Sequence, residues 1–364
     1  MPHLLIDALS VNNFSGRHVL TGHVRQMRIA LPDWRLSMLV QQGQSQLALD
    51  CDVAPLEAPV GVGALGRVWF TQRHLRQWTR DIGADLLFTP AGMLTAGCPL
   101  PQIVLAQNPW PLVDLARGRE RVRTYLQRHA FAAAQRRARV MVYNSRYMQA
   151  LYAAKLGERS GASLIAYQGI DERYFDQASP CALSERRDLV LVSVMAAHKA
   201  VEDAVAAFAL ANLGHQTRLR LIGPWPDVSY RRQIERIVAA HGLAGRVVFE
   251  GEIASAGLLA AYRYARAFVL LSRCESFGIP AIEAQSQGTP TIVAMGTAAP
   301  EVAGAGGLVV PSGAVGAAAQ AMTALMSDDA LWHRYSHAAL DNAGRFRFTH
   351  CSAPLIDALR ELAP

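Results

Sequence analysis

Two glutamates, Glu275 and Glu283, bracket the segment whose residue types could do chemistry, ESFGIPAIE. An apolar run ends just before it, and Pro280 suits the first position of a helix, where its missing N–H costs nothing. An ionised carboxylate accepts hydrogen bonds at both oxygens, so two of them on one loop and helix can hold the hydroxyls of a polyol. The unpaired N–H groups of the helix start suit a phosphate. The alternative, an ordinary loop with two solvated glutamates, is disfavoured by the longer string ESFGIPAIEAQSQGTP.

A lysine is the second candidate. Only two of the 36 basic residues are lysines, Lys155 and Lys199. Lys199 follows a predicted strand and precedes a predicted helix, and a compact ammonium is a good point charge for phosphate. The alternative is a surface lysine at the start of a helix. In a chain that uses arginine almost everywhere else, we favour a function for Lys199.

The elements that would position these residues alternate between short apolar runs and longer amphipathic stretches. This βαβα pattern is typical of parallel α/β sheets, whose ligands bind at the carboxyl ends of the strands. We predict strands at 3–8, 35–41, 85–89, 102–106, 140–144, 162–167, 188–194, 218–222, 246–250, 267–272 and 291–294. We predict helices at 22–30, 68–81, 120–137, 200–211, 229–241, 256–265, 280–287 and 313–326, and an amphipathic helix near the carboxyl terminus.

Length and composition restrict the classes of protein. A chain of 364 residues with 51% hydrophobic content predicts about two folded domains. No apolar stretch has the length of a membrane-spanning helix, and the first ten residues lack the basic start of a signal peptide. The five dispersed cysteines predict no disulfide framework, so the cytoplasm is the expected compartment. The 11 histidines are scattered without a metal motif, and the net charge of +7 favours anionic partners.

The segment 275–290 resembles the signature of the family 4 retaining nucleotide-sugar glycosyltransferases, E-x-F-G-x-P-x-x-E-A-x-x-x-G-x-P, at every fixed position. The resemblance continues in RVVFEGEI (246–253) and in APEVAGAGGLVVPSG (299–313), and it is looser in the first half. It implies the α/β GT-B fold, in which two Rossmann-like domains face a central cleft. The expected parts are an acceptor-binding domain at 1–170, a nucleotide-sugar-binding domain at 171–344, and a helix at 345–364 that crosses back to the first domain.

The resemblance also implies roles for single residues. Glu283 would hold the ribose hydroxyls of the donor and Glu275 would lie beside its sugar. Lys199, with backbone N–H groups, would stabilise the leaving diphosphate, so that Glu275 and Lys199 are the expected catalytic residues. No metal and no cofactor are implied. The further residues expected at the donor are Ser276, Phe277, Gly278, Ile279, His198, Gly251, Ile253 and Gly16.

Three departures from the family pattern stand out. The family has G-R-x-x-x-x-K-G around the lysine, whereas this chain has Val194 at the arginine position and no glycine at either end. The loop at 12–18 holds one glycine, Gly16, where two or more are usual, and Arg17 there is expected to face the acceptor. Relatives often carry a histidine after the strand 102–106, where this chain has Gln107 and Asn108. An amide is no general base, so Asn108 would position an acceptor hydroxyl without deprotonating it.

The segment 117–146 concentrates positive charge, with nine arginines and one acid, Glu120. A solvated helix is the plain interpretation. Contact with anionic lipid or with a lipid-diphosphate acceptor is the second. Nucleic acid is disfavoured because no nucleic-acid-binding motif accompanies the charge.

Together these features predict a retaining, metal-independent glycosyltransferase. It would move a sugar, mannose or glucose, from a nucleotide-diphosphate sugar to a glycan or lipid-linked acceptor in bacterial surface polysaccharide synthesis. It would be cytoplasmic, with peripheral contact to the inner face of an anionic membrane, and without a nucleic-acid partner. The alternatives are a GT-B binding subunit that has lost catalysis and a nucleotide-sugar epimerase. A pyridoxal phosphorylase is disfavoured by the scarcity of lysine, and a nicotinamide dehydrogenase by the absence of G-x-G-x-x-G.

Overall fold

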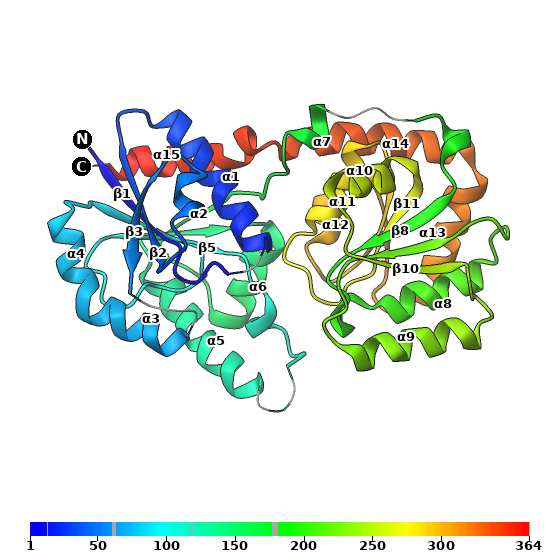
Figure 1. Cartoon of the computed structure of the whole chain (residues 1–364), viewed down its shortest axis with the longest axis horizontal. Helices are drawn as coiled ribbons and strands as arrows, with labels where there is room; N and C mark the ends of the chain where they lie inside the picture. Colours follow the sequence, from blue (N-terminus) through cyan, green and yellow to red (C-terminus); the bar gives the residue numbers. More distant parts are fainter. Residues whose placement is uncertain (13, 60–62, 117, 119, 177–180, 364) are drawn as a thin grey trace. The chain divides into compact units, whose positions relative to one another are not determined.

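The chain folds into two α/β units (Figure 1). A computed structural model describes all residues except 13, 60–62, 117, 119, 177–180 and 364. The first unit comprises Met1–Gly169 together with Phe348–Pro364, and the second comprises Ile170–Arg347. Each unit has one sheet of its own.

The first unit contains a seven-stranded parallel sheet in the order β3-β2-β1-β4-β5-β6-β7. Every residue of β1 and of β5 is buried, as expected for parallel strands covered on both faces. Its strands are β1 (His3–Asp7), β2 (Arg35–Gln41), β3 (Ala54–Ala58), β4 (Leu86–Thr89), β5 (Gln102–Ala106), β6 (Val140–Tyr143) and β7 (Ala162–Ile165). Its helices are α1 (Phe14–Ala30), α2 (Gln46–Leu49), α3 (Ala64–Phe70), α4 (Arg76–Asp81), α5 (Glu120–Arg137), α6 (Arg146–Leu156) and α15 (Phe348–Leu362).

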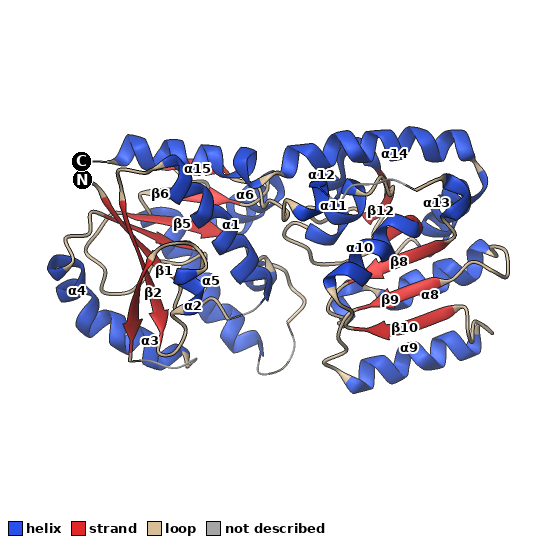
Figure 2. Ribbon diagram, turned by 45° about the horizontal axis from the view of Figure 1, so that its top comes forward, coloured by secondary structure: helices blue, strands red, loops and turns tan. Residues whose placement is uncertain are grey.

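The second unit contains a six-stranded parallel sheet in the order β10-β9-β8-β11-β12-β13, with helices on both of its faces (Figure 2). One large apolar core joins the sheet to α8, α9 and α13. Its strands are β8 (Asp188–Val192), β9 (Leu219–Ile222), β10 (Val247–Gly251), β11 (Ala265–Leu270), β12 (Thr291–Ala294) and β13 (Gly307–Val310). Its helices are α7 (Arg173–Asp176), α8 (Val201–Ala211), α9 (Val228–Ala240), α10 (Ser255–Tyr264), α11 (Ile279–Ser286), α12 (Ala299–Ala303), α13 (Val315–Ser327) and α14 (Asp329–Ala343).

The sequence-based α/β prediction is confirmed, and its errors have local causes. The short strands β3 and β13 and the helix α6 were not predicted. The strand β3 lies at an edge of its sheet and contains Pro55, which a central strand would not tolerate. The helix predicted at 68–81 is interrupted: a π-helical turn, Thr71–Leu75, separates α3 from α4. The helix predicted to start at Gly22 starts at Phe14.

Gly22 lies inside α1 because the helix α15 packs against it. A Cβ on Gly22 would lie 2.0 Å from the ring of Phe348, and one on Gly169 would lie 2.6 Å from the same ring. The two glycines thus form a slot for Phe348. Next to it, the ring of His23 forms a buried hydrogen bond of 2.8 Å with the Ser352 hydroxyl. Burial lowers the pKa of His23 to about 4, so this imidazole is neutral at pH 7.

We expect Gly22→Ala to lower the free energy of unfolding by ~1–3 kcal/mol, because the added methyl group overpacks the Phe348 slot. Urea denaturation measures the change. The matched control is Gly316→Ala in α13, where a Cβ meets no atom within 4 Å. A helical alanine there should be neutral or stabilising by roughly 0.5–1 kcal/mol. Equal effects of the two substitutions would show that the slot is not tightly packed.

Candidate functional site

The loop 271–278 between β11 and α11 forms the centre of the candidate site in the second unit. Gly278 caps α11 in the left-handed region, at φ +103°, where a Cβ would lie 3.1 Å from the Leu270 side chain. Phe277 is buried and packs edge-on against Phe346, with ring centroids 5.7 Å apart. This buried anchor fixes the loop, so the first N–H groups of α11 lie at the carboxyl end of the sheet.

An ion pair joins this loop to the one after β8. The Lys199 ammonium donates to Glu275 Oε2 at 2.6 Å, and the side chains are only 17% and 15% exposed. Lys199 ends the short 3-10 helix Ala197–Lys199, which lies between β8 and α8. Because β8 and β11 are neighbouring parallel strands, their carboxyl ends bring together residues 76 positions apart. Removing one partner would leave a largely buried charge without compensation.

Arg273 ties the same two loops together. Its backbone N–H donates to the carbonyl of His198 at 2.8 Å. Its guanidinium donates to Glu202 and to Asp203, each at 2.7 Å, in the first turn of α8. Arg273 was not predicted as a site residue, and its charge is engaged by these two carboxylates. It supports the loop that carries Lys199.

Two residues near Lys199 bear on the departures from the family pattern. Ala200 takes the left-handed conformation, at φ +53°, although it is not a glycine. This conformation is one that a glycine adopts without strain, so the glycine of the family pattern would suit the backbone at this position. Val194, at the position of the family's arginine, is 53% exposed.

Glu283 lies in the middle of α11, half-buried behind two tyrosines. The Tyr262 hydroxyl donates to Glu283 Oε2 at 2.8 Å, and the Tyr174 hydroxyl also donates to this carboxylate. Burial raises the pKa of the Glu283 carboxyl to about 7, while the two hydrogen bonds lower it. Glu283 is therefore about half protonated at neutral pH. The two tyrosines come from α10 and α7, and no local pattern connected them with Glu283.

The other predicted donor residues of this unit lie at the same edge of the sheet. Gly251 ends β10 at φ +67° and its carbonyl accepts from the Gly223 N–H at 2.7 Å. Ile253 follows it, half-buried. Ser276 lies in the loop with Glu275, and Ile279 begins α11. A Cβ on Gly223, after β9, would lie 1.9 Å from the Ser193 carbonyl, so this turn requires glycine.

In the first unit, the prediction of a loop at 12–18 is wrong, because α1 begins at Phe14. Gly16 and Arg17 lie in the first turn of α1, and Asn13 lies outside the described residues. The Arg17 guanidinium donates to the Gln44 side chain at 2.6 Å. The His18 ring contacts the Gly169 carbonyl at 3.2 Å.

The predicted acceptor loop after β5 is held by its own amides. Asn108 Oδ1 accepts from the Trp110 N–H at 3.0 Å. Gln107 donates to the Pro90 carbonyl at 3.0 Å and accepts from Gln168 at 3.3 Å. Asn144, directly after β6, was not predicted as a site residue. It is fully buried, with both side-chain polar atoms unpaired among the described residues. A polar residue directly after an apolar run was the available signal.

Among the described residues, no group of three or more histidine, cysteine, aspartate or glutamate side chains could hold a metal ion. No helix within the described ranges is long and apolar enough to cross a membrane.

Comparison with known proteins adds to this geometry. Residues 176–342 match the family model described as Glycosyl transferases group 1. Mannosylfructose-phosphate synthase of Agrobacterium fabrum is 46% identical over 67 residues, which are 18% of this chain and 15% of that protein. O-antigen chain mannosyltransferase B of Escherichia coli is 33% identical over 119 residues, 32% of this chain and 31% of that protein. The chain thus spans about a third or less of the length of these curated relatives.

A solved structure resembles the whole chain. Anabaena HepE, in complex with UDP and glucose, superposes with a TM-score of 0.75 at 16% identity, covering 99% of this chain and all of that one. At this identity the likeness concerns the fold. The chain therefore has the GT-B fold of two Rossmann-like α/β domains, and its residues 176–342 match the Glycosyl transferases group 1 family.

Proposed function

We propose that the chain is a retaining glycosyltransferase of family 4 that uses a nucleotide-diphosphate sugar. The observation that carries the proposal is the Lys199–Glu275 pair at the start of α11, with Glu283 one turn further along the same helix. The unit thereby offers an ammonium and helix N–H groups for a diphosphate, and carboxylates for sugar and ribose hydroxyls. The match to a glycosyltransferase family over this unit and the UDP and glucose bound in HepE support it.

In the proposed reaction, the bond between the anomeric carbon and the diphosphate oxygen breaks as the acceptor hydroxyl attacks from the same face. The acceptor proton passes to the departing diphosphate oxygen. Lys199 and the N–H groups of 277–279 stabilise the negative charge that develops there, and such fixed donors are usually the largest contribution to catalysis. An ammonium has three donors, so Lys199 can keep Glu275 while it binds a phosphate oxygen. Glu275 orients the sugar.

The proposal extends to donor, acceptor and location. We infer that mannose or glucose is moved to a glycan or lipid-linked acceptor in surface polysaccharide synthesis, at the cytoplasmic face of a membrane. The mannosyltransferase relative named for the O-antigen chain supports this assignment. No metal or cofactor takes part in the proposed step, because Lys199 and the helix N–H groups offset the charge of the leaving group.

A thermal-shift screen against UDP, GDP, ADP, CMP and NAD, with and without Mg²⁺, tests the proposal first. A ligand at 100 times its dissociation constant adds about 2.7 kcal/mol to stability, which shifts the melting temperature by several degrees. A shift with one nucleoside diphosphate, followed by hydrolysis of the corresponding nucleotide sugar with retained anomeric configuration, would support a transferase. Binding without any turnover on any acceptor or water would instead assign a binding subunit.

We expect Lys199→Met to weaken binding of that nucleoside diphosphate by about tenfold or more, because it removes the ammonium from the phosphates. The nucleoside alone should bind almost as before. Isothermal titration gives the ratio of variant to wild-type affinity for each of the two ligands. General destabilisation of the fold would lower both affinities alike. The control is Lys155→Met, which removes the other lysine, paired with exposed Asp114 at 3.4 Å in the first unit. Equal losses for both ligands would remove Lys199 from the phosphate site.

The raised pKa of Glu283 predicts that nucleotide affinity rises with pH. Ribose hydroxyls donate to the ionised carboxylate, and half of it is protonated near pH 7. Affinity should therefore increase up to about tenfold per pH unit below pH 7 and level off above it, and binding at pH 7 should release about half a proton per ligand bound. Titration in buffers of different ionisation enthalpy measures that proton. Glu283→Gln should abolish both effects, whereas Glu235→Gln on the exposed face of α9 should change neither.

The raised pKa of the Glu283 carboxyl also affects folding. The pKa of Glu283 is higher in the folded chain than the ordinary value of 4.5. Its contribution to stability is therefore complete below pH 4.5 and is lost as pH rises through about 7. Glu283→Gln should remove that part of the pH dependence, which urea denaturation at pH 5 and pH 8 would detect. If stability depended on pH in the same way in wild type and variant, the pKa of Glu283 would not be raised in the folded chain.

A further inference from the structure

The helix α5 is apolar on the face that points away from its unit. Val122, Tyr125 and Leu126 are 66%, 62% and 63% exposed. Residues three and four apart share a helix face, so these three form one apolar surface, which we call the outer face of α5. The inner face is defined by the buried residues Thr124, Phe131, Ala134 and Gln135. In Figure 1 the first turns of α5 lie at the lower margin of the first unit.

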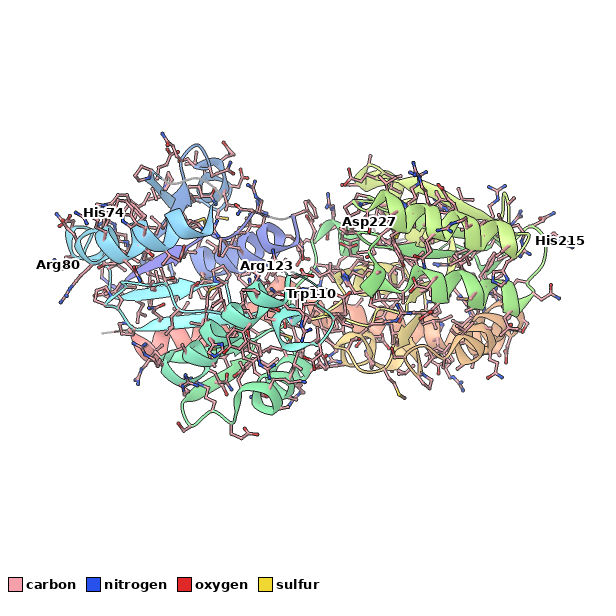
Figure 3. The ribbon with its side chains drawn as sticks, turned by 90° about the horizontal axis from the view of Figure 1, so that it is seen from below. His74, Arg80, Trp110, Arg123, His215 and Asp227 are labelled. Carbon is pink, nitrogen blue, oxygen red and sulfur yellow. The ribbon has the colours of Figure 1, made fainter. Side chains whose placement is uncertain are left out.

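Arginines flank this outer face, and among the described residues only one of those on α5 is paired with an acid. The helix carries Arg121, Arg123, Arg128, Arg136 and Arg137 against one acid, Glu120, which gives a net charge of +4. Glu120 accepts from Arg123 and from the Trp110 indole, each at 3.1 Å, near the start of α5 (Figure 3). None of the other four arginines forms an ion pair with a described residue.

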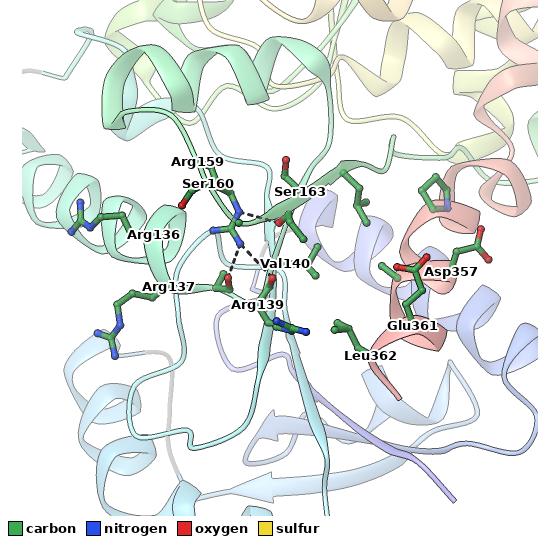
Figure 4. Close-up of a pocket in the computed structure, with 16 residues that line it drawn as sticks. Arg136, Arg137, Arg139, Val140, Arg159, Ser160, Ser163, Asp357, Glu361 and Leu362 are labelled. Atoms are coloured by element: carbon green, nitrogen blue, oxygen red, sulfur yellow. Dashed lines mark hydrogen bonds between the residues drawn. The ribbon is translucent and has the colours of Figure 1, made fainter. Parts of the chain in front are cut away.

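The far end of α5 is equally basic. In Figure 4 the side chains of Arg136 and Arg137 point away from the acids Asp357 and Glu361, which line the opposite side of a nearby pocket. Arg159 in the same pocket donates to the backbone carbonyls of Ala138 and Ala162, so it has a structural role. The positive charge of α5 therefore remains available to a partner along its length.

We propose that the outer face of α5 docks on an anionic lipid bilayer. Apolar side chains between arginines are the pattern of a helix that lies in the membrane interface, with its apolar face in the boundary of headgroups and acyl chains. Tyrosine is favoured at headgroup level, where its ring is buried and its hydroxyl stays wet. Arginines at the edges reach lipid phosphates, each adding to the attraction.

Charge argues against the two other occupants of such a face. A symmetric contact with a second copy of the chain would place one +4 helix against another. A nucleic acid would use the arginines but would leave Val122 and Leu126 unburied. The docking inference is independent of the proposed transferase activity, and its test contains no sugar donor.

The test is co-sedimentation of the whole chain with vesicles of phosphatidylcholine, with and without phosphatidylglycerol. We expect binding to the anionic vesicles only, weakened by salt because the attraction is partly electrostatic. The variant Val122→Ser/Leu126→Ser should bind the anionic vesicles at least about tenfold more weakly than wild type. The matched control, Val228→Ser/Leu210→Ser, removes a valine and a leucine that are 60% and 62% exposed in the second unit. It should bind like wild type.

Three results would overturn the inference. The first is no binding of the wild-type chain to anionic vesicles, and the second is equal binding by the two serine variants. The third is a concentration-dependent dimer in sedimentation velocity that only Val122→Ser/Leu126→Ser abolishes, which would assign the face to self-association. Melting curves of both variants show that they are folded, so a loss of binding cannot be attributed to unfolding.

Discussion

The ion pair between Lys199 and Glu275 is the interaction on which the candidate site depends. Its side chains are nearly buried, so each charge requires the other, and the two loops that carry them must keep their relative position. Parallel pairing of β8 with β11 brings the loops to one edge, and Arg273 then fastens them through Glu202 and Asp203. A short basic and acidic network thus determines where the start of α11 lies.

The need to hold the two loops in place also explains the backbone conformation next to Lys199. Ala200 is held in a left-handed conformation between the 3-10 helix and α8, which places the lysine side chain toward Glu275. An alanine there costs about 1–2 kcal/mol relative to a residue without a Cβ. The packing of the loops against Arg273 and the core must offset this strain. The region therefore combines a fixed backbone with a charged side chain, which is what preorganised anion binding needs.

The sequence predicted the architecture through patterns that are local, and it could not predict contacts that are not. Alternating apolar and amphipathic runs predicted most strands to within two residues, and the string from Glu275 to Pro290 predicted the loop and α11. The edge strand β3 was not predicted because Pro55 and Glu57 interrupt its apolar pattern. The tyrosines around Glu283 and the arginine behind Lys199 come from other elements, so only the folded chain shows them. The catalytic and binding roles of the site residues stay predictions.

The slot of Gly22 and Gly169 for Phe348 has a consequence for how the protein is made. The first unit is completed by α15, which is synthesised after the whole of the second unit. At about 5–20 residues per second, roughly 10–35 s separate the emergence of Gly169 from that of Phe348. Throughout that interval the nascent first unit lacks the helix that covers α1. Its final closure must therefore follow the synthesis of the second unit, which has time to fold first as an independent insertion.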